Sequence, residues 1–128
     1  MALVGKKFPN VTVDAISKSG ENQRINILDE AVNKQTKVLL FWYPKDFTFV
    51  CPTELHAFQA ALEEFKNRNT MVIGASCDTN EVHFAWLSTP KNMGGIEGVT
   101  YPLLADTHRQ LANILGIVDQ DFEYDEEG

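Results

Sequence analysis

Cys51 is the residue of this chain best placed to do chemistry, because it stands between a proline-containing turn and an expected helix. Thr48 lies three residues before Cys51, and Pro52 follows it directly. Proline donates no backbone hydrogen bond, and the first turn of a helix tolerates that loss. We therefore expect Cys51 at a helix N-terminus, where free amides and the helix dipole stabilise an anion.

A thiol in this position is expected to ionise more readily than a free cysteine, whose pKa is about 8.5. The hydroxyl of Thr48 can donate to the thiolate or to an oxygen bound beside it, and Pro44 can shield the site from water without adding a donor. A peroxide would oxidise such a thiolate to a sulfenic acid. The sequence thus predicts a redox-active Cys51. The alternative is a small buried cysteine in an ordinary strand-to-helix turn.

The segment around Cys51 resembles the active-site signature of the typical two-cysteine peroxiredoxins. The resemblance rests on the pattern Pro44-x-x-x-Thr48-x-x-Cys51 and on its continuation to Glu54. Further segments similar to the family occur in the family's order, at residues 4–9, 72–78, 83–86, 89–91 and 102–106. The resemblance covers essentially the whole chain, and it implies a thioredoxin-like α/β fold.

The resemblance also implies a reaction and its partners. Cys51 would attack hydrogen peroxide or an organic hydroperoxide and become a sulfenic acid, in antioxidant defence and redox homeostasis. Thr48 and nearby backbone amides would stabilise charge on the peroxide oxygens, while Pro44 would shield the site. A resolving thiol would condense with the sulfenic acid, and thioredoxin or a flavoprotein disulfide reductase would then restore the Cys51 thiol. No metal, haem or flavin cofactor is implied.

Other residues with reactive side chains have two interpretations. In the family the glutamate that matches Glu54 helps to organise the active-site hydrogen bonds, but Glu54 could equally be an exposed carboxylate that favours the helix dipole. Cys77 is expected to be a packing residue at the end of a strand, with an auxiliary thiol as the alternative. The histidines are expected to be surface or packing residues rather than ligands; they are His56, His83 and His108.

Apolar runs and turn residues predict the elements that position Cys51. Strands are expected at residues 10–15, 24–27, 37–43, 71–76 and 101–104, the first two joined as a hairpin around Ser19 and Gly20. Helices are expected at residues 51–66, 81–88 and 108–115. The apolar residues of these helices are Leu55, Phe58, Leu62 and Phe65 in the first and Val82, Ala85 and Trp86 in the second. This alternation predicts a mainly parallel sheet covered on both faces, with reactive residues at the carboxyl ends of its strands.

Composition predicts a single domain spanning residues 1–128, since 44% of the 128 residues are hydrophobic. The net charge of −7 argues against nucleic-acid binding. We expect a cytoplasmic protein without a membrane partner, because the sequence shows no signal segment and no apolar span of membrane length. The two cysteines lack the short spacing of a disulfide scaffold or a zinc site.

The resemblance implies that the domain is incomplete at its C-terminus. In the family an arginine that contacts the thiolate follows shortly after this point, and a β-hairpin, a closing helix and the arm with the resolving cysteine come later. We therefore expect weak peroxidase activity from this chain alone and uncovered apolar residues such as Leu39, Phe41 and Ile73. Family members form homodimers by edge-to-edge pairing of their sheets, and often rings of five dimers through the region of residues 47–49. The pairing strand of the family would lie beyond Gly128, so we expect dimerisation of this chain to be lost or altered. Glu81 stands where ring-forming members usually carry an aromatic residue.

Two functions other than peroxide reduction remain open on the sequence. A thioredoxin-like disulfide reductase is one, and the absence of a CxxC motif counts against it. The other is a truncated, non-catalytic fragment that acts through binding or as a holdase, which the expected incomplete C-terminus favours.

Overall fold

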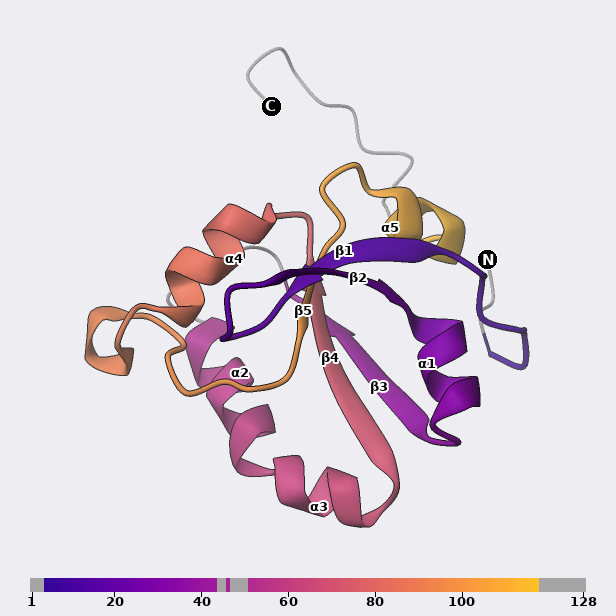
Figure 1. Cartoon of the computed structure of the whole chain (residues 1–128), viewed down its shortest axis with the longest axis horizontal. Coiled ribbons are helices and arrows are strands. Elements are labelled where there is room, and N and C mark those ends of the chain that lie inside the picture. Colours follow the sequence, from indigo (N-terminus) through magenta and orange to yellow (C-terminus); the bar gives the residue numbers. More distant parts are fainter. Residues whose placement is uncertain (1–3, 44–45, 47–50, 118–128) are drawn as a thin grey trace.

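The computed structural model of the chain describes residues 4–43, 46 and 51–117 (Figure 1). Their helices and strands follow one another in the order β1 (Thr12–Ile16), β2 (Asn22–Asn26), α1 (Ile27–Asn33), β3 (Lys37–Trp42), α2 (Cys51–Ala60), α3 (Leu62–Asn67), β4 (Thr70–Ser76), α4 (Asn80–Leu87), β5 (Leu103–Ala105) and α5 (Gln110–Leu115). A short 3₁₀ helix, Lys91–Met93, follows α4. The predicted alternation of strands and helices is confirmed.

The strands form one sheet in the order β2-β1-β5-β4-β3. Strand β4 pairs in parallel with both β3 and β5, whereas β1 pairs antiparallel with β2 and β5. Four strands therefore run in one direction and β1 runs in the other. This confirms a mainly parallel sheet, with β1 reversed because a short hairpin joins it to β2.

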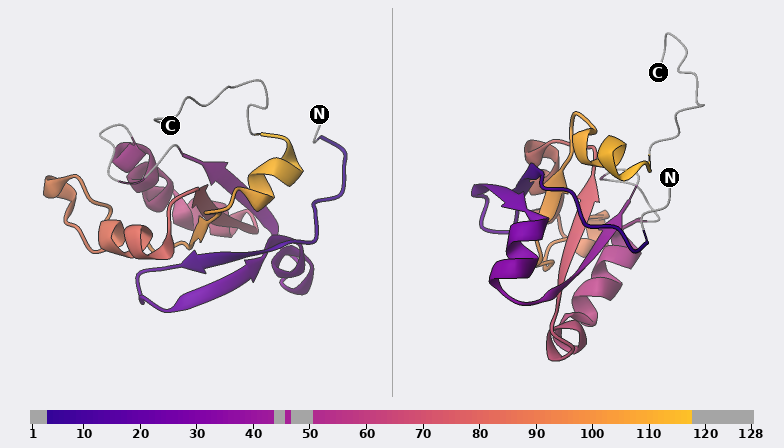
Figure 2. Two further views of the ribbon diagram at one scale, coloured as in Figure 1. Left: turned by 90° about the horizontal axis from the view of Figure 1, so that it is seen from above. Right: turned by 90° about the vertical axis from the view of Figure 1, so that its right-hand side faces the viewer.

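Helices cover both sides of the sheet, as the two views of Figure 2 show. Side chains alternate along a strand, so that Val72 and Ile73 of β4 point to opposite faces. The core around Val72 receives residues of α2, α3 and α4. The core around Ile73 receives residues of α1 and α5. The predicted coverage of both faces is thereby confirmed.

The N-terminal hairpin turns where the sequence predicts. Gly20 has φ +81°, and its amide donates to the carbonyl of Ser17 over 3.0 Å. Glycine adopts this left-handed conformation without steric cost. Helix α1 was not expected, and Ile27 begins this helix rather than ending a strand. The side chain of Asn26 accepts a hydrogen bond from the amide of Asp29 and so caps the helix.

The helix predicted for residues 51–66 is divided into α2 and α3. Ala61, which lies between them, has φ −92° and ψ 3°. Alanine is the best helix former, so its own preference does not cause this break, and the tertiary packing of the two halves must impose it. The apolar residues of both halves reach the same core, with Leu55 fully buried and the others packed against it: Phe58, Leu62 and Phe65.

Helix α4 presents a different face to the core from the predicted one. Val82 and Ala85 are exposed, whereas His83, Trp86 and Leu87 are buried. These three positions form one helical face because their spacing is i, i+3 and i+4. The two largest apolar side chains of this face, Trp86 and Leu87, orient the helix, and they bring His83 inside with them.

Strand β3 lies at one edge of the sheet and pairs only with β4 among the described strands. Leu39 and Phe41 are half-buried and pack against the core around Val72. The expectation that Ile73 is uncovered is wrong, because its strand is internal and its side chain is fully buried. None of the helices within the described residues is long and apolar enough to cross a lipid bilayer.

Candidate active site

The carboxyl ends of β3, β4 and β5 meet at one edge of the sheet. Trp42 lies beside Ala75, which lies beside Leu104. Just beyond them, the amide of Tyr43 donates to the carbonyl of Ala75 over 3.0 Å. The residues that follow the three strands are therefore brought together at this edge, where open α/β sheets usually place their ligand and catalytic residues.

Cys51 is the first residue of α2, as the sequence predicts. Helix α2 follows the segment that leaves β3 at the carboxyl edge, so that its N-terminus belongs to this edge. Glu54 lies in the first turn of α2 with an exposed side chain. The other two predicted site residues, Pro44 and Thr48, lie outside the described residues. Their roles, like that of Cys51, stay predictions.

Cys77 follows β4 directly and has a free, half-buried thiol. It lies at the same edge of the sheet as the end of β3, since β3 and β4 pair in parallel and in register. Both of its interpretations, packing residue and auxiliary thiol, therefore stay open.

Contacts from the chain that precedes β5 hold α2 in place. The hydroxyl of Tyr101 donates to the carbonyl of Leu55 over 2.8 Å. Burial raises the pKa of Tyr101, which keeps this hydroxyl protonated and able to donate. In the next residue, His56, the ring nitrogen Nε2 lies 3.1 Å from the carbonyl oxygen of Gly95. These contacts fix the first two turns of the helix that begins with Cys51.

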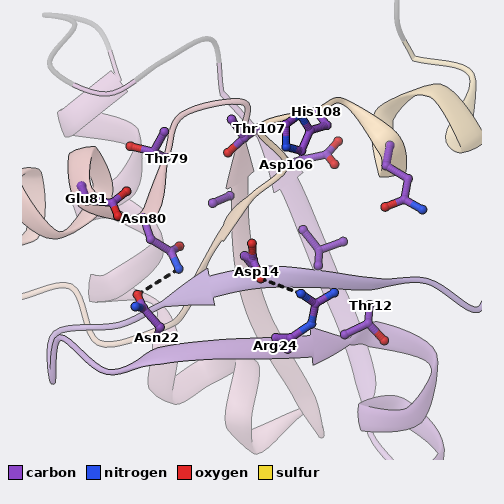
Figure 3. A pocket seen from close by; sticks show the side chains of 13 residues that line it. Thr12, Asp14, Asn22, Arg24, Thr79, Asn80, Glu81, Asp106, Thr107 and His108 are labelled. Atoms are coloured by element: carbon purple, nitrogen blue, oxygen red, sulfur yellow. Dashed lines mark hydrogen bonds and ion pairs between the residues drawn. The ribbon is translucent and has the colours of Figure 1, made fainter.

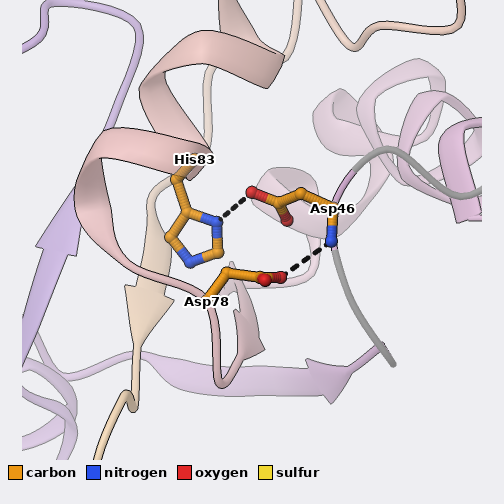
Figure 4. Close-up of side chains that lie close together, drawn as sticks. All are labelled: Asp46, Asp78 and His83. Carbon is orange, nitrogen blue, oxygen red and sulfur yellow. Dashed lines mark hydrogen bonds and ion pairs between the residues drawn. The ribbon is translucent and has the colours of Figure 1, made fainter.

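Asp46 is the centre of a buried hydrogen-bond cluster at the carboxyl edge of the sheet (Figure 4). Its carboxylate accepts a hydrogen bond from the hydroxyl of Tyr43 at 2.7 Å. Its other oxygen, Oδ2, lies 2.6 Å from Nδ1 of His83 in α4. The second ring nitrogen of His83, Nε2, lies 2.9 Å from the carbonyl oxygen of Leu104. Asp46 is 4% exposed and His83 is fully buried, so that water competes with neither contact.

The backbone of Asp46 is held as well. Its amide donates to Oδ2 of Asp78 over 2.7 Å, and the hydroxyl of Ser76 donates to the same oxygen over 2.9 Å. Asp78 follows β4, so the cluster joins the segment after β3 to the ends of the two neighbouring strands and to α4. Asp46 is thus fixed through both its main chain and its side chain.

Burial shifts the protonation of the cluster. Burial raises the pKa of Asp46, and the hydrogen bond and charge of His83 oppose this effect without cancelling it. Burial also raises the pKa of Tyr43, and the neighbouring Asp46 carboxylate raises it further. Tyr43 therefore keeps its hydroxyl proton, which it donates to Asp46.

The raised pKa of Asp46 predicts a pH dependence of stability. The folded chain binds a proton at Asp46 more tightly than the unfolded chain does, so this contribution is present below the ordinary value of 3.8 and is lost as the pH rises through the raised value. We expect the free energy of unfolding of the wild type, relative to Asp46→Asn, to fall as the pH rises above about 4. Urea unfolding of both proteins between about pH 4 and 8 measures this difference. A constant difference, or one that grows with pH, would contradict the assignment.

The cluster contains three side chains of types that bind metals, but the distance between His83 and Asp46 fits a shared proton better than a metal ion. One ligand atom each from Asp46, Asp78 and His83 lie within 4.8 Å of one another. Two ligands on one ion, each at about 2.0–2.2 Å from it, stand roughly 3 Å or more apart. The separation of 2.6 Å between Nδ1 of His83 and Oδ2 of Asp46 is shorter than that. Nε2 of His83 faces a backbone carbonyl, so neither ring nitrogen is open to a metal.

A polar hollow of about 430 Å³ opens between the hairpin and the starts of α4 and α5 (Figure 3). Its lining includes an exposed ion pair, in which Arg24 lies 3.1 Å from Asp14. Cys77 is not among the described residues that line it. A second hollow, of about 450 Å³, lies along α2 and is lined by Pro52, Thr53, His56, Ala57, Ala60, Lys91 and Gly94. This second hollow includes Pro52, the residue directly after the predicted reactive Cys51.

The sequence indicated neither the cluster nor the place of His83 in it. His83 is buried, as a packing histidine would be, but both of its ring nitrogens are also hydrogen-bonded. The sequence offers one signal for this arrangement. His83 stands three residues before the large apolar Trp86, and hence on the same face of the helix. A titratable residue on an apolar helix face needs a buried partner, but the partner, Asp46, is far away in the chain.

Comparison with known proteins gives a consistent result. A profile of the AhpC/TSA family matches residues 4–127. Peroxiredoxin-1 of Gekko japonicus is 43% identical over 120 residues, which cover 94% of this chain and 59% of that protein. Alkyl hydroperoxide reductase C of Helicobacter pylori is 41% identical over 110 residues, which cover 86% of this chain and 55% of that protein. This chain thus spans less than two thirds of the length of these relatives.

Solved structures agree on the fold. The reduced 2-Cys peroxiredoxin of Plasmodium vivax superimposes with a TM-score of 0.84 at 33% identity, covering 94% of this chain and 72% of that one. AhpC of Enterococcus faecalis gives a TM-score of 0.80 at 33% identity, covering 94% of this chain and 68% of that one. The fold is therefore the thioredoxin-like α/β fold that the sequence predicts, and the chain belongs to the AhpC/TSA family, the family of the peroxiredoxins.

Proposed function

We propose that this chain is the catalytic unit of a thiol-dependent peroxidase that reduces hydrogen peroxide and organic hydroperoxides at Cys51. The observation that carries the proposal is the place of Cys51 as the first residue of α2, at the carboxyl edge of the sheet. Membership of the AhpC/TSA family and the names of the relatives support it. The free amides of the helix N-terminus favour the thiolate form that the reaction needs.

The reaction begins when the Cys51 thiolate attacks one oxygen of the peroxide. A sulfur–oxygen bond forms, the oxygen–oxygen bond breaks, and sulfur loses two electrons to the departing oxygen. Cys51 becomes a sulfenic acid, and the departing hydroxide or alkoxide takes up a proton to leave as water or an alcohol. Thr48 and the amides before Cys51 stabilise the charge on the peroxide oxygens. Pro44 shields the thiolate, and Glu54 helps to organise the hydrogen bonds of the site.

Turnover needs a second thiol and a source of electrons. A resolving thiol condenses with the sulfenic acid, so that a disulfide forms and water leaves. Thioredoxin or a flavoprotein disulfide reductase then reduces this disulfide by thiol–disulfide exchange. We assign residues 1–128 to a single domain of a cytoplasmic protein, in a family whose members assemble as homodimers or decamers.

Oxidation of the purified chain by hydrogen peroxide tests the proposal directly. With about one equivalent of peroxide and a trap for sulfenic acids, we expect one adduct per chain, and peptide mapping should place it on Cys51. Little disulfide between Cys51 and Cys77 should form, because Cys77 is not expected to be the principal resolving thiol. Adduct formation on Cys77 in place of Cys51, or no adduct at all, would contradict the proposed function.

A further inference from the structure

The cluster around Asp46 holds a proton whose position follows from the hydrogen-bond geometry. Nε2 of His83 faces the carbonyl oxygen of Leu104 at 2.9 Å, and a carbonyl only accepts, so this nitrogen carries a hydrogen. Tyr43 has a single hydroxyl hydrogen, which it donates to Oδ1 of Asp46. That hydrogen therefore does not serve Nδ1 of His83 as well, although the hydroxyl lies 3.2 Å from it.

The remaining contact, between Nδ1 of His83 and Oδ2 of Asp46, is 2.6 Å long. A neutral imidazole with its hydrogen on Nε2 and an ionised carboxylate would present two lone pairs to each other at this distance. One more hydrogen must therefore lie between the two atoms, whether it is bound mainly to nitrogen or to oxygen. The pair has no net charge in either case, which is the state that a fully buried site favours.

Asp46, one member of this neutral pair, is the only described residue between Tyr43 and Cys51. Asp46 stands two residues before Thr48 and five before Cys51. Its side chain contacts His83 of α4, and its amide donates to Asp78 after β4. Neither of these partners belongs to the segment or to α2. The contacts therefore tie Asp46, five residues before Cys51, to α4 and to the residues that follow β4.

We propose that His83 is a positioning residue of the peroxidase site: through the proton it shares with Asp46, it fixes the position of Asp46, five residues before Cys51, as the reaction at Cys51 requires. This inference rests on the proposed function for its catalytic consequence. Misplacing a reacting group by about 1 Å costs roughly a hundredfold in rate, so a residue that acts only through position can have a large effect.

Three variants, each made with Cys77→Ser so that only Cys51 reacts, separate this role from a general effect on stability. His83→Leu removes both ring nitrogens and leaves the Asp46 carboxylate buried without its shared proton. Asp46→Asn keeps every hydrogen bond, because its amide can donate to Nδ1 of a neutral His83 and its oxygen can accept from Tyr43. The double variant Asp46→Asn/His83→Leu also replaces the Asp46 carboxylate, which His83→Leu alone leaves buried and unpaired. If His83→Leu does not fold, the double variant is measured in its place.

Asp106→Asn is the matched control. Asp106 is also a buried aspartate, 3% exposed, and also follows a strand of the sheet. Its carboxylate accepts hydrogen bonds from the amides of Leu111 and Ala112 at the start of α5, away from the segment before Cys51. The control therefore weakens a comparable buried site without touching the positioning contacts.

Two measurements on folded protein decide the inference: the rate constant of Cys51 with hydrogen peroxide, and the hydrogen exchange of amides 46–51. We expect His83→Leu, or the double variant, to lose about tenfold or more in rate, and Asp46→Asn to keep about a third or more of it. Hydrogen exchange of amides 46–51 should accelerate in His83→Leu or the double variant, but not in Asp106→Asn. The rate constant of Asp106→Asn with peroxide should stay within about twofold of the wild-type value. Equal losses in His83→Leu and Asp106→Asn, with equal exchange, would reduce His83 to a structural residue.

The exchange measurement separates the two claims. If wild-type Cys51 does not react with peroxide, the proposed function is wrong. The positioning of the segment by His83 is then decided by exchange alone, and unchanged exchange of amides 46–51 in His83→Leu or the double variant overturns it.

Discussion

Replacement of Cys51 by serine is expected to abolish peroxide reduction, with a fall in the second-order rate constant of at least about a thousandfold. A serine hydroxyl stays protonated at neutral pH even at the helix N-terminus where α2 begins. An oxygen nucleophile also cannot accept the peroxide oxygen as sulfur does in forming a sulfenic acid. Stopped-flow measurement of peroxide consumption, with wild type and variant at equal concentration, gives the ratio of the two rate constants.

Cys77→Ser is the matched control for this substitution. Cys77 is a half-buried thiol at the same edge of the sheet, and its replacement also removes one sulfur from the chain. We expect the first oxidation step to keep its rate within about twofold, because surface and partly buried changes away from the nucleophile are usually mild. If Cys77→Ser loses as much activity as Cys51→Ser, the assignment of Cys51 as the sole nucleophile is wrong.

Trp86→Ala is expected to have the largest effect on stability, about 3–5 kcal/mol. Trp86 is fully buried in the core around Val72, and its ring centroid lies 5.7 Å from that of Tyr43. Its indole Nε1 donates to the carbonyl of Gly94 over 2.9 Å, so the substitution removes both packing and the anchor of the following loop. Natural domains have only about 5–15 kcal/mol in total, so this loss removes a large share of the stability.

Phe84→Ala is the comparison for the core substitution. Phe84 lies on the same helix but is 40% exposed, and its replacement should cost below about 1 kcal/mol. Chemical denaturation followed by far-UV circular dichroism reports both values. Similar losses for Trp86→Ala and Phe84→Ala would mean that α4 does not dock through the face defined by His83, Trp86 and Leu87.

The sequence was most informative where burial and local pattern agree. The apolar runs that form β3 and β4 are predicted as strands by both criteria. The helix that begins at Cys51 is predicted by Pro52 and by apolar residues at helical spacing. The left-handed Gly116, at φ +73°, ends α5 where a glycine is expected to. For the site, the position of Cys51 at a helix start followed from the same local signals.

What the sequence did not reveal depends on tertiary contacts. Helix α1 is short and capped by Asn26, and the apolar Ile27 before its charged residues reads equally well as the end of a strand. The hydrogen bonds of His83 were missed because its partner, Asp46, is brought to it by the packing of α4 on the sheet. Periodicity reports which face of a helix is apolar, and a polar residue on that face has no partner until the fold supplies one.

The place of β1 between β2 and β5 affects how this protein folds while it is being translated. Asp14 pairs with Ala105, a residue translated roughly 90 positions later, and at about 5–20 residues per second this delay is several seconds or more. During that time β1 and β2 have only each other, and an isolated two-stranded hairpin is marginally stable in water. The central part of the sheet therefore closes late, when β5 emerges and enters the gap between β1 and β4. Until then, the nascent chain carries the open edge of β1 as a surface for chaperones to protect.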